Sequence, residues 1–474
     1  MRPSAALRQG AGSRETACGR RSQRRHITWG DPGKDDTDER FDGTTGGPGQ
    51  TSSGKRPEPA SRYRTVATGS RTEKGASMVK PLHSVIDKVY RMSNLVKASK
   101  KVCSNKGAAG IDKVTVEAWR AKEEAHLRQL HGLLYADAYR SQPVRRVYIP
   151  KQGTNKQRPL GIPTLEERVC QQAVLQALEP TFEEIFFEGS YGFRPGRSTH
   201  TAKEAILEYK KAGYRYVVDL DISNFFNEVD HAILMKLVRE VVKDRRVLRL
   251  IRGWLTAGVM EEGNVRYEVS GTPQGGVISP LLSGIYLTPF DRGLQAAGYA
   301  HVRYADDVLI LCKTREEAEA ALQVANELLS RLKLRLSPEK TVISSFQEGF
   351  DFLGFHFGKR HVGVGKKSLK SIYAKVREAT RRNQGDIPVE KVIAELNPKI
   401  EGWANYHRHG NNIVMFCNLD KWVRNRVRAY IRRRWRDRGR WKIYSAEELD
   451  RMGLVRMEWK IPRYQQLKLF ESPR

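Results

Sequence analysis

The sequence predicts an α+β core followed by an all-α, strongly basic block, and two observations lead to this fold class. Between residues 145 and 355, short apolar runs with the composition of strands alternate with segments whose apolar residues recur at helical spacing. After Gly354 the composition changes, and residues 366–440 combine helical spacing with many Lys and Arg. Strands mixed with helices, followed by helices alone, indicate an α+β core with a helical appendage.

The individual elements follow in order along the chain. Apolar residues recur every three or four positions in segments that are therefore predicted to be helices: 85–96, 117–134, 165–187, 199–211 and 316–332. Other runs have the composition of strands: 145–149, 216–222 and 302–312, the last as two short strands with a turn at its paired aspartates. Residues 150–163 are predicted to be a basic loop, and residues 366–440 to be three basic helices.

Composition also predicts the domain boundaries. Residues 1–77 are rich in Gly, Ser, Thr, Arg and Pro, so they cannot bury enough apolar surface to offset the entropy of ordering and are predicted to be a disordered basic arm. The mixed core is expected to cover residues 78–360 and the helical block residues 361–440. Residues 441–474 are expected to be a short basic tail that binds DNA.

The charge of the chain favours a nucleic acid as its partner. Lys and Arg total 84 against 54 Asp and Glu, which gives a net charge of +30 and a pI near 10.0. Such an excess neutralises phosphates and releases their counterions. A ribosomal or membrane-surface protein is the alternative at this stage. The five cysteines contain no C-x-x-C pair, and no apolar run is long enough to span a membrane, so a zinc ribbon, a disulfide framework and a membrane span are not expected.

Three acidic residues are candidates for a metal site. Asp221 lies in the run VVDLDISNFF, and Asp306 and Asp307 lie in YADD, in each case beside apolar residues at a predicted strand end. Carboxylates in such surroundings are unfavourable unless a cation neutralises them. Two Mg²⁺ ions, with Mn²⁺ as a substitute, would activate a primer 3′-hydroxyl and stabilise the leaving pyrophosphate. The alternative is that these acids cap turns or form salt bridges.

A series of motifs extends this interpretation. In chain order they are RPLGIP at 158–163, YGFRPG at 191–196, DISNFF at 221–226, GTPQGG at 271–276, YADD at 304–307, LSPEKT at 336–341 and FLGF at 352–355. The series resembles the ordered reverse-transcriptase blocks of group II intron-encoded proteins over residues 80–440. The resemblance implies a right-hand polymerase, with fingers and an antiparallel palm sheet in the mixed core and an all-α thumb, or maturase, domain in the helical block.

The resemblance also assigns the residues around the metals. Asp221 matches the first palm acid because an aromatic residue, Phe226, follows it at the family's spacing; Asp219 would be a supporting acid or a salt-bridge partner. The carbonyl of Ile222 is implied as a further metal ligand beside Asp306 and Asp307. Phe226 would lie under the sugar of the incoming nucleotide, the alternative being a core residue.

Further residues are implied to contact nucleotide or nucleic acid. Lys151 and Arg158 would bind the triphosphate, for which an ammonium and a guanidinium are suited. Gln274 would line the nucleotide pocket, and Lys340 would contact a primer or template phosphate. Gly354 fits a hairpin that supports the primer end.

The second functional signal is the basic segment 421–440, in which ten of twenty residues are Lys or Arg. Apolar residues at 423, 427, 430 or 431, and 435 form a stripe, and the opposite face is predicted to bind nucleic acid through Arg424, Arg428, Arg432 and Arg436. A merely solvated charged helix is the alternative. The preceding NPKIEGWANYH, at 397–407, resembles the family's maturase motif; Trp403 and Tyr406 would either stack on bases or pack in a helical core.

The expected function is therefore that of an RNA-directed DNA polymerase that binds group II intron RNA, assists its splicing and copies it during intron mobility. Template RNA with a DNA primer, dNTPs and target DNA are the other expected partners, and the bacterial cytoplasm and nucleoid the expected location. Endonuclease activity is not expected, because residues 441–474 lack cysteines. The alternatives are a splicing-only maturase with a vestigial polymerase and a domesticated reverse transcriptase that works without an intron.

Overall fold

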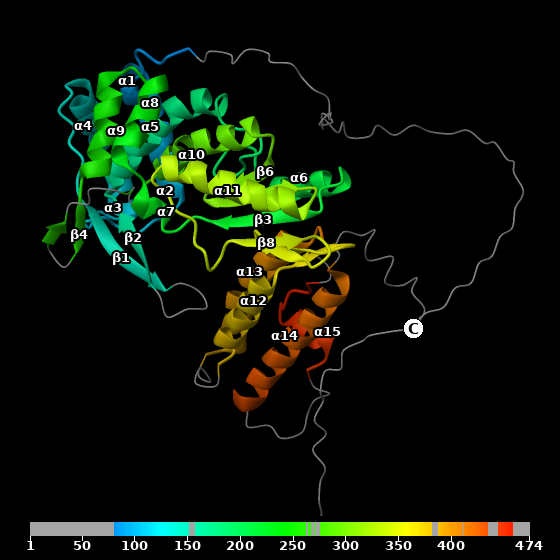
Figure 1. The fold of residues 1–474 in the computed structure, drawn as a ribbon. Coiled ribbons are helices and arrows are strands. Elements are labelled where there is room, and N and C mark those ends of the chain that lie inside the picture. The colour runs from blue at the N-terminus through cyan, green and yellow to red at the C-terminus, as the bar shows by residue number, and fades with distance from the viewer. Residues whose placement is uncertain are drawn as a thin grey trace, which may run out of the picture. The chain divides into compact units, whose positions relative to one another are not determined.

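The computed structural model describes residues 80–150, 157–261, 264–266, 271, 275–381, 387–410, 412–434 and 444–457 (Figure 1). The chain divides into two units, Met1–Glu73 and Lys74–Arg474, and every described residue belongs to the second. The predicted disordered arm therefore lies outside the described residues, as do positions 441–443 and 458–474 of the predicted tail.

Helices make up most of the first part of this unit: α1 (Ile86–Tyr90), α2 (Met92–Ser104), α3 (Val116–Ala121), α4 (Glu123–Tyr135) and α5 (Leu165–Glu183). The single helix predicted over 117–134 is divided at Lys122, whose φ of −128° and ψ of 26° are not helical. The division lets Trp119 Nε1 donate to Ser99 Oγ at 3.0 Å, while the same hydroxyl donates to Glu123 at 2.5 Å. Tertiary hydrogen bonding thus overrides the helical periodicity at this point.

A four-stranded sheet accompanies these helices, in the order β2-β1-β4-β5. Its strands are β1 (Val144–Pro150), β2 (Gln157–Ile162), β4 (Val259–Glu261) and β5 (Asn264–Arg266). The prediction of a loop over 150–163 is wrong for β2, which pairs antiparallel with β1 from Arg145↔Ile162 to Pro150↔Gln157. The strand contains Pro159 and Gly161, which argue against a strand in sequence terms. Pro159 is tolerated because β2 is an edge strand.

A second four-stranded sheet, called here the central sheet, is antiparallel throughout and has the order β6-β7-β3-β8. Its strands are β3 (Tyr216–Asp221), β6 (Ala300–Tyr304), β7 (Asp307–Cys312) and β8 (Val342–Ser345). The strand predicted at 216–222 and the strand pair predicted at 302–312 are both confirmed.

The central sheet separates two apolar cores. Val218 and Leu220 of β3 point into a large core that includes α10 (Ser279–Ala296) and α11 (Arg315–Arg331), which Figure 1 shows lying along one side of the strands. Val217 of β3 points into a smaller core with α6 (Thr199–Lys211) and the phenylalanines of β9 (Phe350–Phe352) and β10 (Phe355–Phe357). The remaining elements of the mixed part are α7 (Phe225–Glu228), α8 (His231–Val241), α9 (Arg245–Thr256) and β11 (Val362–Val364).

Several helix starts follow directly from the sequence. Thr164, Ser198, Asp230 and Thr314 each accept a hydrogen bond from the backbone N–H three residues later, which satisfies a donor in the first helical turn. The hairpin expected at Gly354 is also present, because β9 and β10 are joined through Leu353 and Gly354, both with positive φ.

The C-terminal helices are α12 (Lys366–Ala379), α13 (Val389–His407), α14 (Ile413–Arg434) and α15 (Ala446–Arg451). They share a core of their own, into which α14 contributes Val423, Val427, Tyr430 and Ile431. The prediction of three helices over 366–440 and the apolar stripe of α14 are confirmed within the described residues; Trp435 lies outside them.

Arg424 is a correction to the predicted cationic face. Its side chain is buried, and its guanidinium forms ion pairs with Asp420 at 2.6 Å and with Asp450 at 2.8 Å. It also donates to the carbonyl of Ala446 at 3.0 Å. Arg424 therefore joins α14 to α15 and is not a surface contact for phosphates. Sequence spacing offers only the pair with Asp420, four residues earlier on the same helix, because Asp450 lies on another helix.

Arg424→Met is expected to lower the free energy of unfolding by about 3–5 kcal/mol, since it leaves the buried carboxylate of Asp420 without its cationic partner, whereas Asp450 keeps its ion pair with Arg456. Lys421→Met, at an exposed position of the same helix, should change it by less than about 0.5 kcal/mol. Chemical denaturation of both variants checks this. Wild-type stability of Arg424→Met together with weakened RNA binding would instead restore Arg424 to the nucleic-acid surface.

Candidate active site

Three predicted carboxylates meet at one end of the central sheet. Asp221 is the last residue of β3, Asp307 is the first residue of β7, and the two are directly opposite in the antiparallel register. Their Cα atoms are therefore about 5 Å apart. Asp306 precedes Asp307 in the tight turn between β6 and β7. Two segments that are 85 residues apart in sequence thus bring these carboxylates together, as the order of the motifs predicted.

A fourth carboxylate, Asp219, lies on the same face of β3, two residues before Asp221. Burial, together with the charges of Asp307 and Asp221, raises the pKa of Asp219 to about 7. Desolvation and the charges of Asp306 and Asp221 raise the pKa of Asp307 to about 6. Within the described part of the chain, Asp219 has no ion-pair partner, and Lys367 is the cation whose charge lowers its pKa.

The carbonyl of Ile222 is directed toward the same place. Ser337 N donates to the Asp221 carbonyl at 2.8 Å, and Ser223 N donates to the Arg335 carbonyl at 2.9 Å. These bonds flank the Ile222↔Leu336 bridge, so the polar groups of Ile222 point away from Leu336 and toward the β7 side. The predicted backbone ligand therefore faces the turn that carries Asp306 and Asp307.

Lys340 contacts this site in a way that the sequence did not predict. Its Nζ lies 2.7 Å from Asp221 Oδ1, and about half of its side chain remains exposed. The phosphate contact expected for Lys340 stays a prediction. Because Ser337 is hydrogen-bonded to Asp221, the LSPEKT segment is nevertheless part of the site.

The residues fit Mg²⁺ in kind. Three carboxylates and one carbonyl supply the oxygen ligands that this ion prefers, and a cation would offset the burial and the mutual repulsion that raise the carboxyl pKa values. Their side chains are not arranged as a complete set of metal ligands, however. Among the described residues, no three Asp, Glu, His or Cys side chains are arranged to hold a metal ion.

Arg158 of β2 lies close enough for its charge to lower the pKa of Asp306, a carboxyl whose pKa burial raises. β2 also contacts the GTPQGG segment, because a Cβ placed on Gly275 would lie 2.4 Å from the Gly161 carbonyl oxygen. With a φ of +115° as well, position 275 requires glycine.

Lys151, Gln274 and Arg436 lie outside the described residues, so their predicted contacts remain predictions.

Comparison with known proteins places this site in a family. Residues 149–357 match the family described as "Reverse transcriptase (RNA-dependent DNA polymerase)", and residues 369–447 match "Group II intron, maturase-specific domain". Protein YkfC of Escherichia coli is 36% identical over 318 residues, which cover 58% of this chain and 83% of YkfC. The chain belongs to the group II intron-encoded reverse transcriptase/maturase family.

The names of two further relatives refer to introns. The group II intron-encoded protein LtrA of Lactococcus lactis is 30% identical over 388 residues, 66% of this chain and 63% of LtrA. An uncharacterized 91 kDa protein in the cob intron of Schizosaccharomyces pombe is 36% identical over 369 residues, 60% of this chain and 46% of that protein. The chain therefore spans less than two thirds of either of these two relatives.

In this reverse transcriptase/maturase, the central sheet is the palm, and the YGFRPG motif packs against the turn that carries Asp306 and Asp307. Residues 189–191 run along the free edge of β6, with Tyr191 N donating to the Arg303 carbonyl at 2.7 Å. A Cβ on Gly192 would lie 2.2 Å from Ala305 N, so only glycine fits there. Ala305 itself has a φ of +60°, a strained value for a residue with a side chain.

A buried ion-pair network, which was not predicted from the sequence, holds the backbone of the same turn. Arg303 of β6 forms a bidentate pair with Asp291 of α10 and donates from Nη1 to the Ala305 carbonyl at 3.0 Å. His301 lies 3.3 Å from the same carboxylate, and all three side chains are buried. A charged residue within the apolar run VRY was the available signal, because a buried Arg requires a partner.

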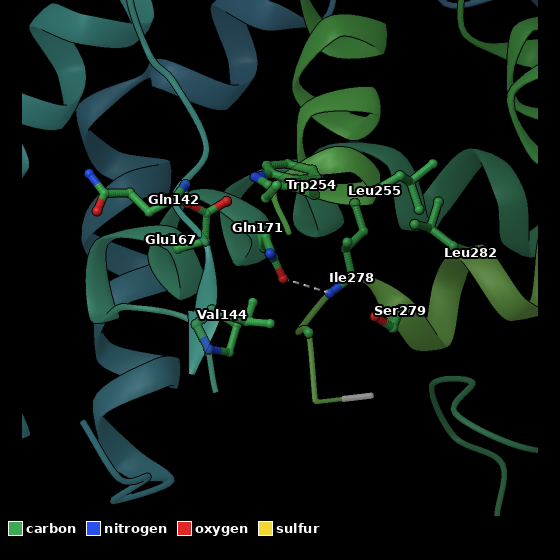
Figure 2. Close-up of a pocket in the computed structure, with 12 residues that line it drawn as sticks. Gln142, Val144, Glu167, Gln171, Trp254, Leu255, Ile278, Ser279 and Leu282 are labelled. Carbon is green, nitrogen blue, oxygen red and sulfur yellow. Dashed lines mark hydrogen bonds between the residues drawn. The ribbon is translucent and has the colours of Figure 1, made fainter. Parts of the chain in front are cut away.

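Figure 2 shows a small pocket behind the GTPQGG segment, lined by α5, α9 and the start of α10. Gln171 Oε1 accepts hydrogen bonds from Val277 N at 2.8 Å and Ile278 N at 3.4 Å, which ties the segment to α5. One turn earlier, Glu167 Oε2 accepts from the Tyr139 hydroxyl at 2.8 Å. Burial raises the pKa of Glu167 to about 7.

The other predicted site residues are placed as follows. Phe226 is half-buried in α7, against Phe225. In the C-terminal helices, Tyr406 donates to the Leu353 carbonyl at 2.8 Å and Trp403 Nε1 to Ser368 Oγ at 3.0 Å, which favours packing over base stacking. Arg428 is partly buried and donates to the Tyr444 carbonyl at 2.6 Å, and Arg432 is partly buried too.

Arg303→Lys is expected to lower the free energy of unfolding by about 2–3 kcal/mol, because an ammonium cannot hold Asp291 and the Ala305 carbonyl with the same fork of hydrogen bonds. Lys313→Arg, at an exposed position after β7, serves as the matched control. Thermal and chemical denaturation measure both. Equal stability of Arg303→Lys and wild type would show that the network does not fasten the turn.

The raised pKa of Glu167 predicts that the stability of the protein depends on pH. Its pKa in the folded protein is raised above the value of 4.5, so its contribution is full below pH 4.5 and is lost as the pH rises to about 7. The loss amounts to at most about 3 kcal/mol. Glu167→Gln should flatten the unfolding free energy between these pH values relative to wild type, whereas Glu124→Gln, at an exposed position of α4, should not. An unchanged slope in Glu167→Gln would refute the assignment.

Proposed function

We propose that the protein extends a DNA primer on an RNA template with two Mg²⁺ ions held by Asp221, Asp306, Asp307 and the Ile222 carbonyl. The observation that carries this proposal is the register of the palm sheet, in which Asp221 and Asp307 are opposite each other and Asp306 occupies the adjoining turn. The ions, when bound, supply activation of the 3′-hydroxyl and stabilisation of the departing pyrophosphate.

The chain's own residues divide the remaining work. The three carboxylates orient the reacting end of the primer by fixing the cations at the strand ends. Arg158 is exposed and its charge lowers the pKa of Asp306, so its guanidinium is available to triphosphate oxygens near the acids. Lys340 pairs with Asp221 at 2.7 Å, and a cation at Asp221 would release this ammonium toward phosphate. Lys151 and Gln274 are proposed to complete the nucleotide pocket.

We further propose that the C-terminal helices bind group II intron RNA, assist its splicing and present it for copying at a DNA target. Support comes from the maturase-specific match over residues 369–447 and from the likeness to LtrA, which is named for its group II intron. Arg428 and Arg432, with Arg436, are the proposed phosphate contacts of α14. Arg424 is excluded from this set because it is buried.

Asp306→Asn is expected to reduce primer extension on an RNA template by at least about 10³-fold, because a site for several kcal/mol of metal stabilisation is lost. Intron RNA binding should remain at the wild-type level or become slightly tighter, since a negative charge is removed. Primer extension and filter binding measure the two activities.

Glu319→Gln, at an exposed carboxylate of α11, is the control and should retain both activities. Full DNA synthesis by Asp306→Asn would contradict the assignment of the acids. RNA binding without any synthesis by the wild-type protein would favour a splicing-only maturase instead.

A further inference from the structure

Phe193, in the YGFRPG motif, combines three features that rarely occur together. Its side chain is 56% exposed, its φ is +61°, and it follows the glycine that packs against the catalytic turn. A positive φ is unfavourable for any residue with a Cβ atom. An exposed phenylalanine at such a position contributes little to the core and is held in an unfavourable conformation.

The residues before Phe193 fix it to the palm. Tyr191 N donates to the Arg303 carbonyl, and the backbone of Gly192 lies directly against Ala305 N. Because Ala305 precedes Asp306, Phe193 directly follows a glycine that touches the turn that carries the proposed catalytic acid.

The residue after Phe193 fixes it equally firmly. Arg194 is buried, and its guanidinium pairs with Glu183 of α5 at 2.9 Å. It also donates to the carbonyls of Phe187 at 2.7 Å and Ser190 at 2.9 Å. The backbone is thus anchored on both sides of Phe193. Within the described part of the chain, no aromatic ring and no cation stacks on Phe193.

A rigid, exposed aromatic ring beside a catalytic turn is suited to a flat apolar surface. The chain has a net charge of +30, and its acidic residues are proposed to act on a primer end. The flat apolar surface that such a site would meet is a nucleobase. Stacking on a base depends on the ring face and not on hydrogen bonds, so it tolerates any base in that place. A preset ring also loses little conformational freedom when the base arrives.

We propose that Phe193 stacks on a nucleobase of the primer–template duplex next to the catalytic turn and so positions the duplex for extension. This proposal rests on the proposed function and deepens it by naming a duplex contact. The base belongs to either the template or the primer strand, and the chemistry of recognition is the same for both.

The test uses the full chain and RNA–DNA primer–template duplexes that carry 2-aminopurine either in the template or near the primer terminus. Neither dNTP nor Mg²⁺ is added, so the measurement does not require synthesis. Wild-type protein should change the 2-aminopurine fluorescence in one of the two strands, and that strand contains the stacked base. Phe193→Tyr, which keeps the ring, should behave like wild type.

Phe193→Ala should abolish this fluorescence change and weaken duplex binding about tenfold. Phe193→Gly removes the ring and also relieves the positive φ, so it should lose the signal while unfolding at a temperature no lower than wild type. Tyr135→Ala, which removes an exposed aromatic ring from α4, should keep the signal and the affinity.

The proposal is overturned if Phe193→Ala and Phe193→Gly retain the wild-type fluorescence change and affinity, or if wild-type protein changes neither strand. Failure of the polymerase proposal has a different signature. There the wild-type protein would show the Phe193-dependent signal but would not extend the primer after Mg²⁺ and dNTPs are added.

Discussion

Repulsion among four carboxylates at one end of the central sheet is the constraint on which the surrounding structure depends. Asp219, Asp221 and Asp307 share one face, and Asp306 adjoins them in the turn. Burial, and after it the charges of the neighbouring aspartates, raises the pKa values of Asp219 and Asp307, which shows the cost of placing these carboxylates here. Such a cluster is unfavourable for a merely structural sheet, and it becomes favourable when cations bind.

The neighbouring elements stabilise the carboxylate cluster and its turn in two ways. Positive charges surround the acids: Lys340 pairs with Asp221, Lys367 lowers the pKa of Asp219 and Asp307, and Arg158 lowers that of Asp306. Rigid contacts also hold the strained turn, since Gly192 packs against Ala305 on one side and Arg303, paired with Asp291, binds its carbonyl on the other. The turn is thus fixed before any substrate arrives.

Sequence reasoning recovered what depends on local pattern. The helices of the C-terminal block and the strands of the palm follow from periodicity, and the convergence of Asp221 with Asp306 and Asp307 follows from motif order. It failed where a partner distant in sequence decides the outcome. β2 forms because β1 pairs with it, despite Pro159 and Gly161. Arg424 is buried because Asp450 reaches it from another helix.

The most direct measurement of the central claim is electron paramagnetic resonance of Mn²⁺ added to the protein bound to a primer–template with a chain-terminated primer and the next dNTP. We expect two coupled Mn²⁺ ions in the wild-type complex and loss of the coupled signal in an Asp221→Asn complex that still binds the duplex. A coupled pair that persists in Asp221→Asn, or no bound Mn²⁺ in the wild-type complex, would contradict the account.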